Sequence, residues 1–198
     1  MPPRPDVSAE RRAQIVDAAM ACFSRKGYNN TTMDDIVAES GLSKGSLYWY
    51  FDSKDELFEA AVASFFEDLG QEALTSLDQY PTAAGKLRGG ALVLADFCRK
   101  AQGLFALLLE FLAQSDRREE ASRFWADILV QYNKAIAEIV EEGIRNGEFK
   151  PVDVKELVWA LMAAYDGLAA YVVLVPDLDL DRISQVFVET LLNGLQAE

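Results

Sequence analysis

The stretch Thr31–Phe58, TTMDDIVAESGLSKGSLYWYFDSKDELF, holds two short helical patterns joined by a tight turn. In the first, from about residue 32 to residue 39, apolar residues recur at i, i+3 and i+4 while acidic residues occupy the other side. Gly41 ends this helix, because glycine tolerates the left-handed backbone that helix C-termini favour. Ser43 is an N-cap for a second helix from about residue 44 to residue 50. The pattern predicts a helix-turn-helix unit.

The second of these helices has an unusual composition, because small, hydroxyl-bearing, basic and aromatic residues replace the Glu, Lys and Ala of an ordinary surface helix. The residues concerned are Lys44, Gly45, Ser46, Tyr48 and Trp49. Glycine and serine permit close approach to a surface, while lysine and aromatic tips can reach phosphates and bases. The composition therefore indicates a helix pressed against nucleic acid. The alternative is a short capped helix whose aromatic residues belong to a core.

The runs TTMDDIVAESG and GLSKGSLYWYFDSKDELF resemble the signature of TetR-family transcriptional regulators. The resemblance extends upstream through RRAQIVDAAMACFSRKGYNNTT, so that it covers about residues 8–62. Its most specific part is the combination of Tyr48, Tyr50-Phe51, Lys54 and Leu57-Phe58 at this spacing. Trp49 occupies a position that varies in the family and is often His or Arg. We therefore expect Trp49 to help set the preferred operator.

This resemblance implies an all-α homodimer of about nine helices per chain. Residues 1–53 would form a helix-turn-helix DNA-binding domain, and residues 54–198 an effector-binding and dimerisation domain, with the fourth helix bridging both. The third helix would enter the major groove of a palindromic double-stranded operator. An effector would then change the separation of the two reading heads, and most members of the family are repressors. The expected DNA contacts are Thr31, Thr32, Ser43, Lys44, Gly45, Ser46, Tyr48, Trp49, Tyr50 and Lys54.

Apolar residues make up 51% of the 198-residue chain, which is enough for a sizeable core. The net charge of −13 at first opposes DNA binding. However, residues 1–58 hold seven Lys and Arg against nine Asp and Glu, a net of −2. Residues 59–198 hold twelve against twenty-three, a net of −11. Most of the acid thus lies outside the predicted DNA-reading part, where it can limit non-specific binding.

Catalytic and metal-binding chemistry has little support in the sequence. The chain contains no His, which excludes a His-based triad, a His general base and a His metal ligand. Phosphate-loop and dinucleotide-binding motifs are absent, and Cys22 and Cys98 do not have a metal-type spacing. We expect no enzyme, cofactor or metal. The cysteine usage and the lack of a signal-peptide core at the N-terminus predict a cytoplasmic protein.

Outside the helix-turn-helix, Pro and Gly punctuate a series of helical patterns. We expect these helices at about residues 8–26, 54–77, 83–100, 103–114, 117–146, 153–175 and 179–195. The stretch Leu157–Val175 approaches membrane-spanning length with the single charge Asp166. A charge near the bilayer centre would cost about 2.5–3.5 kcal/mol, and the flanks are acidic. We therefore predict a helix buried on most faces rather than a membrane span.

The last two predicted helices carry apolar stripes with more apolar surface than one molecule needs, which indicates a subunit interface. The expected interface residues are Tyr165, Ala169, Val172, Phe187, Thr190 and Leu191. The alternative is that both helices lie inside a monomer.

Aromatic residues outside the helix-turn-helix predict an apolar effector cavity enclosed by helices four to eight. The expected ligand-binding residues are Phe66, Phe97, Phe105, Glu110, Phe111, Trp125, Tyr132, Trp159, Tyr165 and Asp166. Aromatic rings favour flat apolar molecules and cations, and basic residues are sparse in these helices. The effector is thus expected to be small, hydrophobic, and neutral or cationic. Glu110 and Asp166 could equally have a structural role.

Two other classes of protein stay open at this point. One is a helical protein-interaction adaptor that binds no DNA, which would require an exposed apolar patch outside the helix-turn-helix. The other is a ligand-binding or enzymatic helical bundle. The DNA-binding interpretation requires Lys44, Tyr48 and Lys54 to be exposed on one face.

Overall fold

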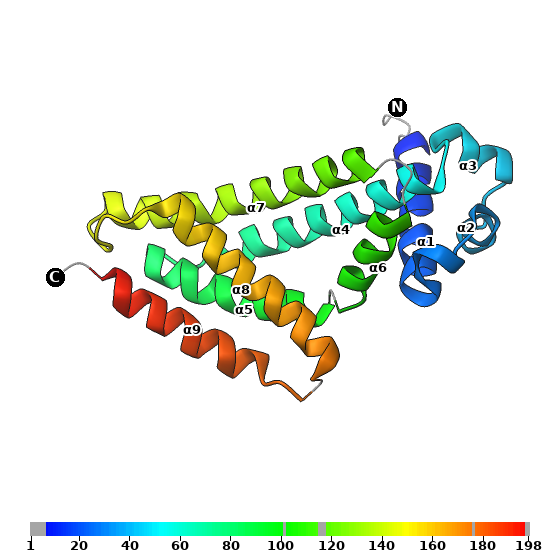
Figure 1. Ribbon diagram of the computed structural model, residues 1–198. Coiled ribbons are helices and arrows are strands. Elements are labelled where there is room, and N and C mark those ends of the chain that lie inside the picture. Colours follow the sequence, from blue (N-terminus) through cyan, green and yellow to red (C-terminus); the bar gives the residue numbers. More distant parts are fainter. Residues whose placement is uncertain (1–6, 101, 115–117, 176, 197–198) are drawn as a thin grey trace, which may run out of the picture. The chain divides into compact units, whose positions relative to one another are not determined.

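A computed structural model describes residues 7–100, 102–114, 118–175 and 177–196, and within these ranges the protein is α-helical (Figure 1). The described helices are α1 (Val7–Asn30), α2 (Met33–Ser40), α3 (Lys44–Tyr50), α4 (Lys54–Leu77), α5 (Ala83–Lys100), α6 (Gln102–Gln114), α7 (Arg118–Arg145), α8 (Val154–Leu174) and α9 (Leu180–Leu195). These helices confirm the predicted all-α fold. It could be predicted because turn residues and caps mark nearly every helix end in the sequence.

The chain divides into two compact units. Unit 1 holds the chain up to Asp68 together with Ala106–Phe124, and unit 2 holds Leu69–Phe105 and the chain from Trp125 onwards. The helices α4, α6 and α7 each pass from one unit to the other. This division differs from the predicted boundary between residues 53 and 54, because the first half of α4 and most of α6 contribute to the core of unit 1.

An aromatic cluster holds unit 1 together. Phe58 of α4 packs edge-on against Phe23 and Tyr28, with ring centroids 5.1 Å apart in both pairs. Phe111 of α6 lies 4.6 Å from the Phe58 ring and 5.2 Å from the Tyr28 ring. Phe23, Phe58 and Phe111 have no exposed surface. Aromatic pairs at these separations add about 0.5–1.5 kcal/mol each beyond the area they bury.

The first helix is interrupted at the position that the sequence marked as its end. Gly27 has φ 80° and ψ 165°, a conformation that side chains with a Cβ rarely adopt. The residues after it turn the chain toward α2. The Tyr28 hydroxyl donates to the Asp55 carboxylate at the start of α4. Burial, and then this bond, raise the pKa of Tyr28 above its usual range.

The core of unit 2 is formed chiefly by α5, α8 and α9, which lie side by side in Figure 1. Val140 of α7 and Phe149 of the following turn close one end of this core. Gly143 makes room for Phe149, since a Cβ at this glycine would lie 2.2 Å from the Phe149 ring. The backbone N–H of Lys150 donates to the Leu195 carbonyl at 2.9 Å, which ties this turn to the end of α9.

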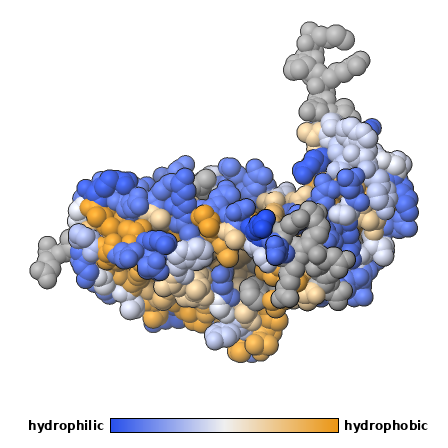
Figure 2. Space-filling view, turned by 45° about the horizontal axis from the view of Figure 1, so that its top comes forward, coloured by the Kyte–Doolittle hydropathy of each residue, from blue (hydrophilic) through white to orange (hydrophobic). Residues whose placement is uncertain are grey.

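α8 is buried on one face, not on most faces as the sequence suggested. Val158, Leu161, Tyr165, Ala169 and Val172 make up most of the buried face. By length and composition alone α8 could cross a membrane, yet only 28% of its most apolar window is buried within the protein. Figure 2 shows broad apolar areas reaching the molecular surface. The outward face of α8 thus requires a separate explanation.

Candidate DNA interface

Local hydrogen bonds define the two helices of the helix-turn-helix. Thr32 is the N-cap of α2, where its hydroxyl accepts from the Asp35 N–H and the Asp35 carboxylate accepts from the Thr32 N–H. Ser43 is the N-cap of α3, and its hydroxyl accepts from the Ser46 N–H at 3.1 Å. Gly41, with φ 68°, caps the C-terminus of α2. Each predicted cap is therefore present.

Ion pairs and a hydrogen bond hold α1 against α2. Arg25 pairs with Glu39 and Lys26 with Asp35, both at 2.6 Å. The bond from Lys26, followed by those from Thr32, lowers the pKa of Asp35 to about 2. Gln14 Nε2 donates to the Ser40 carbonyl at 2.7 Å. These contacts fix the orientation of the helix pair from which α3 projects.

α3 presents an exposed basic and aromatic face. The exposed fraction is 73% for Trp49 and 42% for Tyr48, whereas Leu47 is fully buried. Lys44 is exposed and pairs with Asp34 of α2 at 2.7 Å. The hydrogen bond from Asp34 raises the pKa of Lys44, so this lysine stays charged. A helix that buries one leucine and exposes these side chains suits insertion into a groove.

Thr31 lies differently from the sequence expectation, which had it contacting DNA. Its exposed fraction is 1%, and its hydroxyl donates to the Gly27 carbonyl at 2.7 Å, with the Cys22 carbonyl 3.3 Å away. The side chain therefore has no surface to offer a ligand. Thr31 instead closes the turn between α1 and α2. The sequence alone does not show which of the adjacent residues Thr31 and Thr32 is the N-cap of α2 and which is buried in the turn.

Lys54 is only partly exposed, because its ammonium turns inward. Nζ donates to the Tyr28 carbonyl at 2.9 Å and lies 4.2 Å from the centre of the Tyr28 ring. Burial lowers the pKa of Lys54. The requirement that Lys44, Tyr48 and Lys54 share an exposed face is thus met by the first two residues. A phosphate contact by Lys54 stays a prediction, and it would have to replace the bond to Tyr28.

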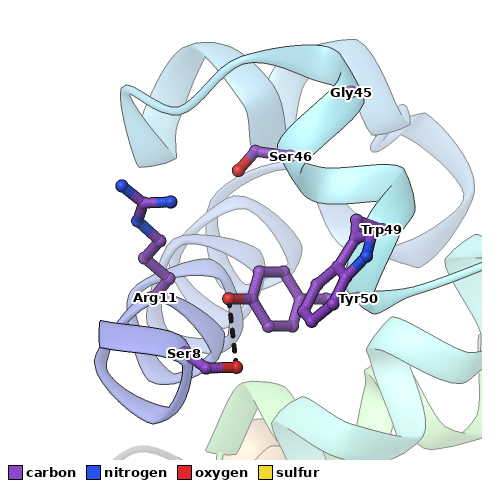
Figure 3. A pocket seen from close by; sticks show the side chains of 6 residues that line it. All are labelled: Ser8, Arg11, Gly45, Ser46, Trp49 and Tyr50. Atoms are coloured by element: carbon purple, nitrogen blue, oxygen red, sulfur yellow. Dashed lines mark hydrogen bonds between the residues drawn. The ribbon is translucent and has the colours of Figure 1, made fainter. Parts of the chain in front are cut away.

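A hollow of about 410 Å³ lies between the first turn of α1 and α3 (Figure 3). Its lining residues are Ser8, Arg11, Gly45, Ser46, Trp49 and Tyr50. Tyr50 bridges the two helices, since its hydroxyl donates to Ser8 Oγ at 3.4 Å. The predicted contacts Gly45, Ser46, Trp49 and Tyr50 therefore lie together. Ser8 was absent from the expected DNA contacts, because it is distant from α3 in sequence.

Two predicted effector residues have structural roles in unit 1. The Glu110 carboxylate lies against the α1–α2 turn, where Oε2 accepts from the Asn29 N–H at 3.3 Å. A Cβ at Gly27 would lie 3.1 Å from this oxygen. Phe111 is fully buried in the aromatic cluster. Both residues attach α6 to α1, which is the structural role left open for Glu110, and a ligand contact by either residue stays a prediction.

The remaining predicted effector residues are divided between the units. Phe66 belongs to unit 1, where its ring is 5.8 Å from that of Phe65. The others, Phe97, Trp125, Tyr132, Trp159, Tyr165 and Asp166, belong to unit 2. The side chain of Phe105 is outside the described part of the structure. Burial raises the pKa of Asp166, to which no described residue donates a hydrogen bond.

Most of the predicted dimer residues face the core of their own chain and not the surface. Tyr165, Ala169 and Val172 are buried inside unit 2, and Phe187 of α9 packs against the Tyr165 ring. Leu191 also packs against this core, while Thr190 is exposed. We define the outer face of α8 as Ala160, Ala163, Gly167, Tyr171 and Leu174, which recur at helical spacing opposite the buried face.

Comparison with known proteins identifies the family. Bacterial regulatory proteins of the tetR family match residues 15–61, and the family described as BetI-type transcriptional repressor, C-terminal, matches residues 88–195. The HTH-type transcriptional repressor KstR2 of Mycolicibacterium smegmatis is 31% identical over 162 residues, which are 76% of this chain and 73% of that protein.

Two solved structures share the fold. The Bacillus subtilis regulator FadR in complex with stearoyl-CoA aligns with a TM-score of 0.71 at 25% identity, over 92% of this chain and 98% of that one. A transcriptional regulator from Saccharomonospora viridis in complex with choline aligns at 0.78 and 20% identity, over 96% and 100%. With both halves of the sequence matched, the chain belongs to the TetR family of transcriptional regulators.

Proposed function

We propose that the protein is a cytoplasmic repressor that binds a palindromic operator as a homodimer and leaves it when a small effector binds. The observation that carries the DNA-binding part is the exposed face of α3, where Tyr48 and Trp49 stand clear of the core that Leu47 anchors. Lys44 adds a cation at the start of the same helix. The repressor named among its relatives supports the sign of regulation.

Selection of genomic fragments by the purified protein tests this function. Wild-type protein is expected to recover sites with two half-sites about 34–36 Å apart, the spacing of one turn of DNA. Trp49→Ala is expected to change the ranking of the recovered sequences, because its exposed ring reads base edges rather than phosphates. Ser24→Ala, at an exposed position of α1, is the control and should leave the ranking unchanged. Recovery of no enriched site by the wild type would refute the DNA-binding role.

The homodimer, in this proposal, is formed by the outer face of α8 together with Val186 and Thr190 of α9. Tyr171 is 60% exposed, Leu174 76% and Val186 50%, whereas a solvated helix face would be charged. Ala160, Ala163 and Gly167 are small enough to let a second helix approach closely. An adaptor protein would also need an exposed apolar patch of this kind. In this proposal a second copy of the chain covers the patch.

The effector, in this proposal, is a small hydrophobic molecule, neutral or cationic, that binds in unit 2. Asp166 supports a cation, because a half-buried carboxyl group without a donor gains from a positive partner. Glu110 is engaged elsewhere, since its carboxylate accepts from the Asn29 N–H. Asp96, a further acidic residue of α5, pairs with Lys100 at 2.8 Å. The ligands bound by the two structural neighbours, stearoyl-CoA and choline, differ in charge, so the charge preference depends on Asp166.

A matched pair of ligands tests the effector charge. We expect hydrophobic quaternary ammonium compounds to raise the melting temperature, since they bind the folded state, and to release DNA. Asp166→Asn should weaken their binding about tenfold or more, and should leave their neutral carbon isosteres unaffected. Glu110→Gln is the control, and we expect it to leave both classes unaffected. The charge assignment is overturned if only anions bind, or if Asp166→Asn leaves cation binding unchanged.

A further inference from the structure

The hollow between α1 and α3 is lined by one arginine together with hydroxyl-bearing and aromatic side chains. Arg11 supplies a guanidinium and Ser46 a hydroxyl group, while the Tyr50 hydroxyl already donates to Ser8. No carboxylate is among its lining residues. A surface of this composition favours an anion with several acceptor oxygens, and a phosphodiester is such an anion.

Among the basic side chains described in residues 7–68, that of Arg11 has no hydrogen bond, ion pair or ring contact. Each of the other Lys and Arg side chains that the structure describes in residues 7–68 has a partner. Arg12 lies over the Phe51 ring at 5.1 Å, Arg25 and Lys26 pair with α2, Lys44 pairs with Asp34, and Lys54 bonds to Tyr28. Arg11 is exposed and makes no hydrogen bond or ion pair with any described residue. Its full charge is therefore available to a ligand.

Contacts between α1 and α3 fix the side chains around the hollow. The Tyr50 hydroxyl donates to Ser8 and thereby joins the end of α3 to the start of α1. Trp49 stacks edge-on against Tyr50 with ring centroids 4.5 Å apart, which forms an aromatic wall. In Figure 3 the Arg11 guanidinium and the Ser46 hydroxyl lie on either side of the opening. Gly45 leaves the α3 side open, since a Cβ there would meet nothing within 4 Å.

We propose that this hollow seats one backbone phosphate of the bound DNA, with the Arg11 guanidinium and the Ser46 hydroxyl as its direct ligands. The proposal rests on the DNA-binding function above and adds α1 to the interface. Because Trp49 lines the same hollow and is exposed beside it, a phosphate held there fixes the position of the reading face of α3 in the groove. Contact with a phosphate carries no base preference, so Arg11 acts on all sequences alike.

Titration of DNA binding against salt tests the proposal. Arg11→Gln is expected to weaken the dimer's binding to an operator and to an unrelated duplex by a similar factor, about tenfold or more. The slope of log affinity against log salt should flatten by about 1.8, from about 0.9 for each of two phosphates. Arg11→Lys, which keeps the charge, should restore the slope. Lys134→Gln removes an equivalent exposed charge in unit 2 and should leave the slope unchanged.

Neutral methylphosphonate linkages identify the phosphate itself. Neutralising one particular phosphate in each half-site is expected to lower the DNA affinity of the wild type. The same substitution should cause no further loss of affinity in Arg11→Gln. An Arg11→Gln protein that melts like the wild type but keeps its salt slope would refute the phosphate seat, as would equal losses for both proteins at every linkage. A wild type that binds no duplex at any salt concentration would instead refute the proposed function.

Discussion

Tyr171→Glu and Leu174→Glu, introduced together, are expected to convert the protein to monomers and to weaken operator binding by about 10²–10⁴-fold. A dimer places its second reading head at a high effective concentration beside the second half-site, and a monomer loses this advantage. The two side chains are among the most exposed apolar groups of unit 2 and point away from its core. Carboxylates facing each other across a symmetric interface would repel and lose water, while on the separated chain they are solvated.

Analytical ultracentrifugation at micromolar concentration measures the first effect, and operator titration at fixed salt measures the second. Ser122→Glu together with Gln131→Glu adds the same charge at exposed positions of α7, and should leave both properties unchanged. The double variant is expected to fold like the wild type, because the outer face of α8 contributes nothing to the core of unit 2. Circular dichroism checks this. A double variant that sediments as a dimer would move the interface elsewhere.

Phe111→Ala is expected to lower the free energy of unfolding of unit 1 by about 3–5 kcal/mol, the usual cost of deleting a buried aromatic side chain. Phe111 is fully buried and contacts the rings of both Tyr28 and Phe58. Tyr28 precedes α2, and Phe58 lies on α4, so the cavity would loosen the attachment of α6 to both. DNA affinity should fall as well, since the α1–α2 turn positions α3.

Leu109→Ala is the matched control for Phe111→Ala, because Leu109 lies on the same helix with 56% of its surface exposed. Truncating an exposed side chain usually changes stability by less than about 0.5 kcal/mol. Urea denaturation followed by circular dichroism gives both values. Similar losses in the two variants would show that α6 does not contribute its aromatic side chain to unit 1.

The sequence alone determined the local features of this protein. The N-caps at Thr32 and Ser43 and the left-handed turn at Gly41 depend on contacts within about four residues, so the helix-turn-helix could be predicted without knowledge of the fold. The exposure of Trp49 followed from the same pattern, since Leu47 is the apolar residue that points to the core of this short helix.

The tertiary structure alone decided what each long-range side chain contacts. α8 is apolar around most of its circumference, so periodicity could not distinguish its buried stripe, which includes Tyr165, from the outer face at Tyr171. Glu110 interrupts an apolar run and therefore resembled a ligand group, yet its partner is the Asn29 N–H, 81 residues away. Folding placed Arg11 of α1 and Ser46 of α3 around one hollow, although the two residues are 35 positions apart in the sequence. Such pairings depend on how helices pack, and no local preference of the chain encodes them.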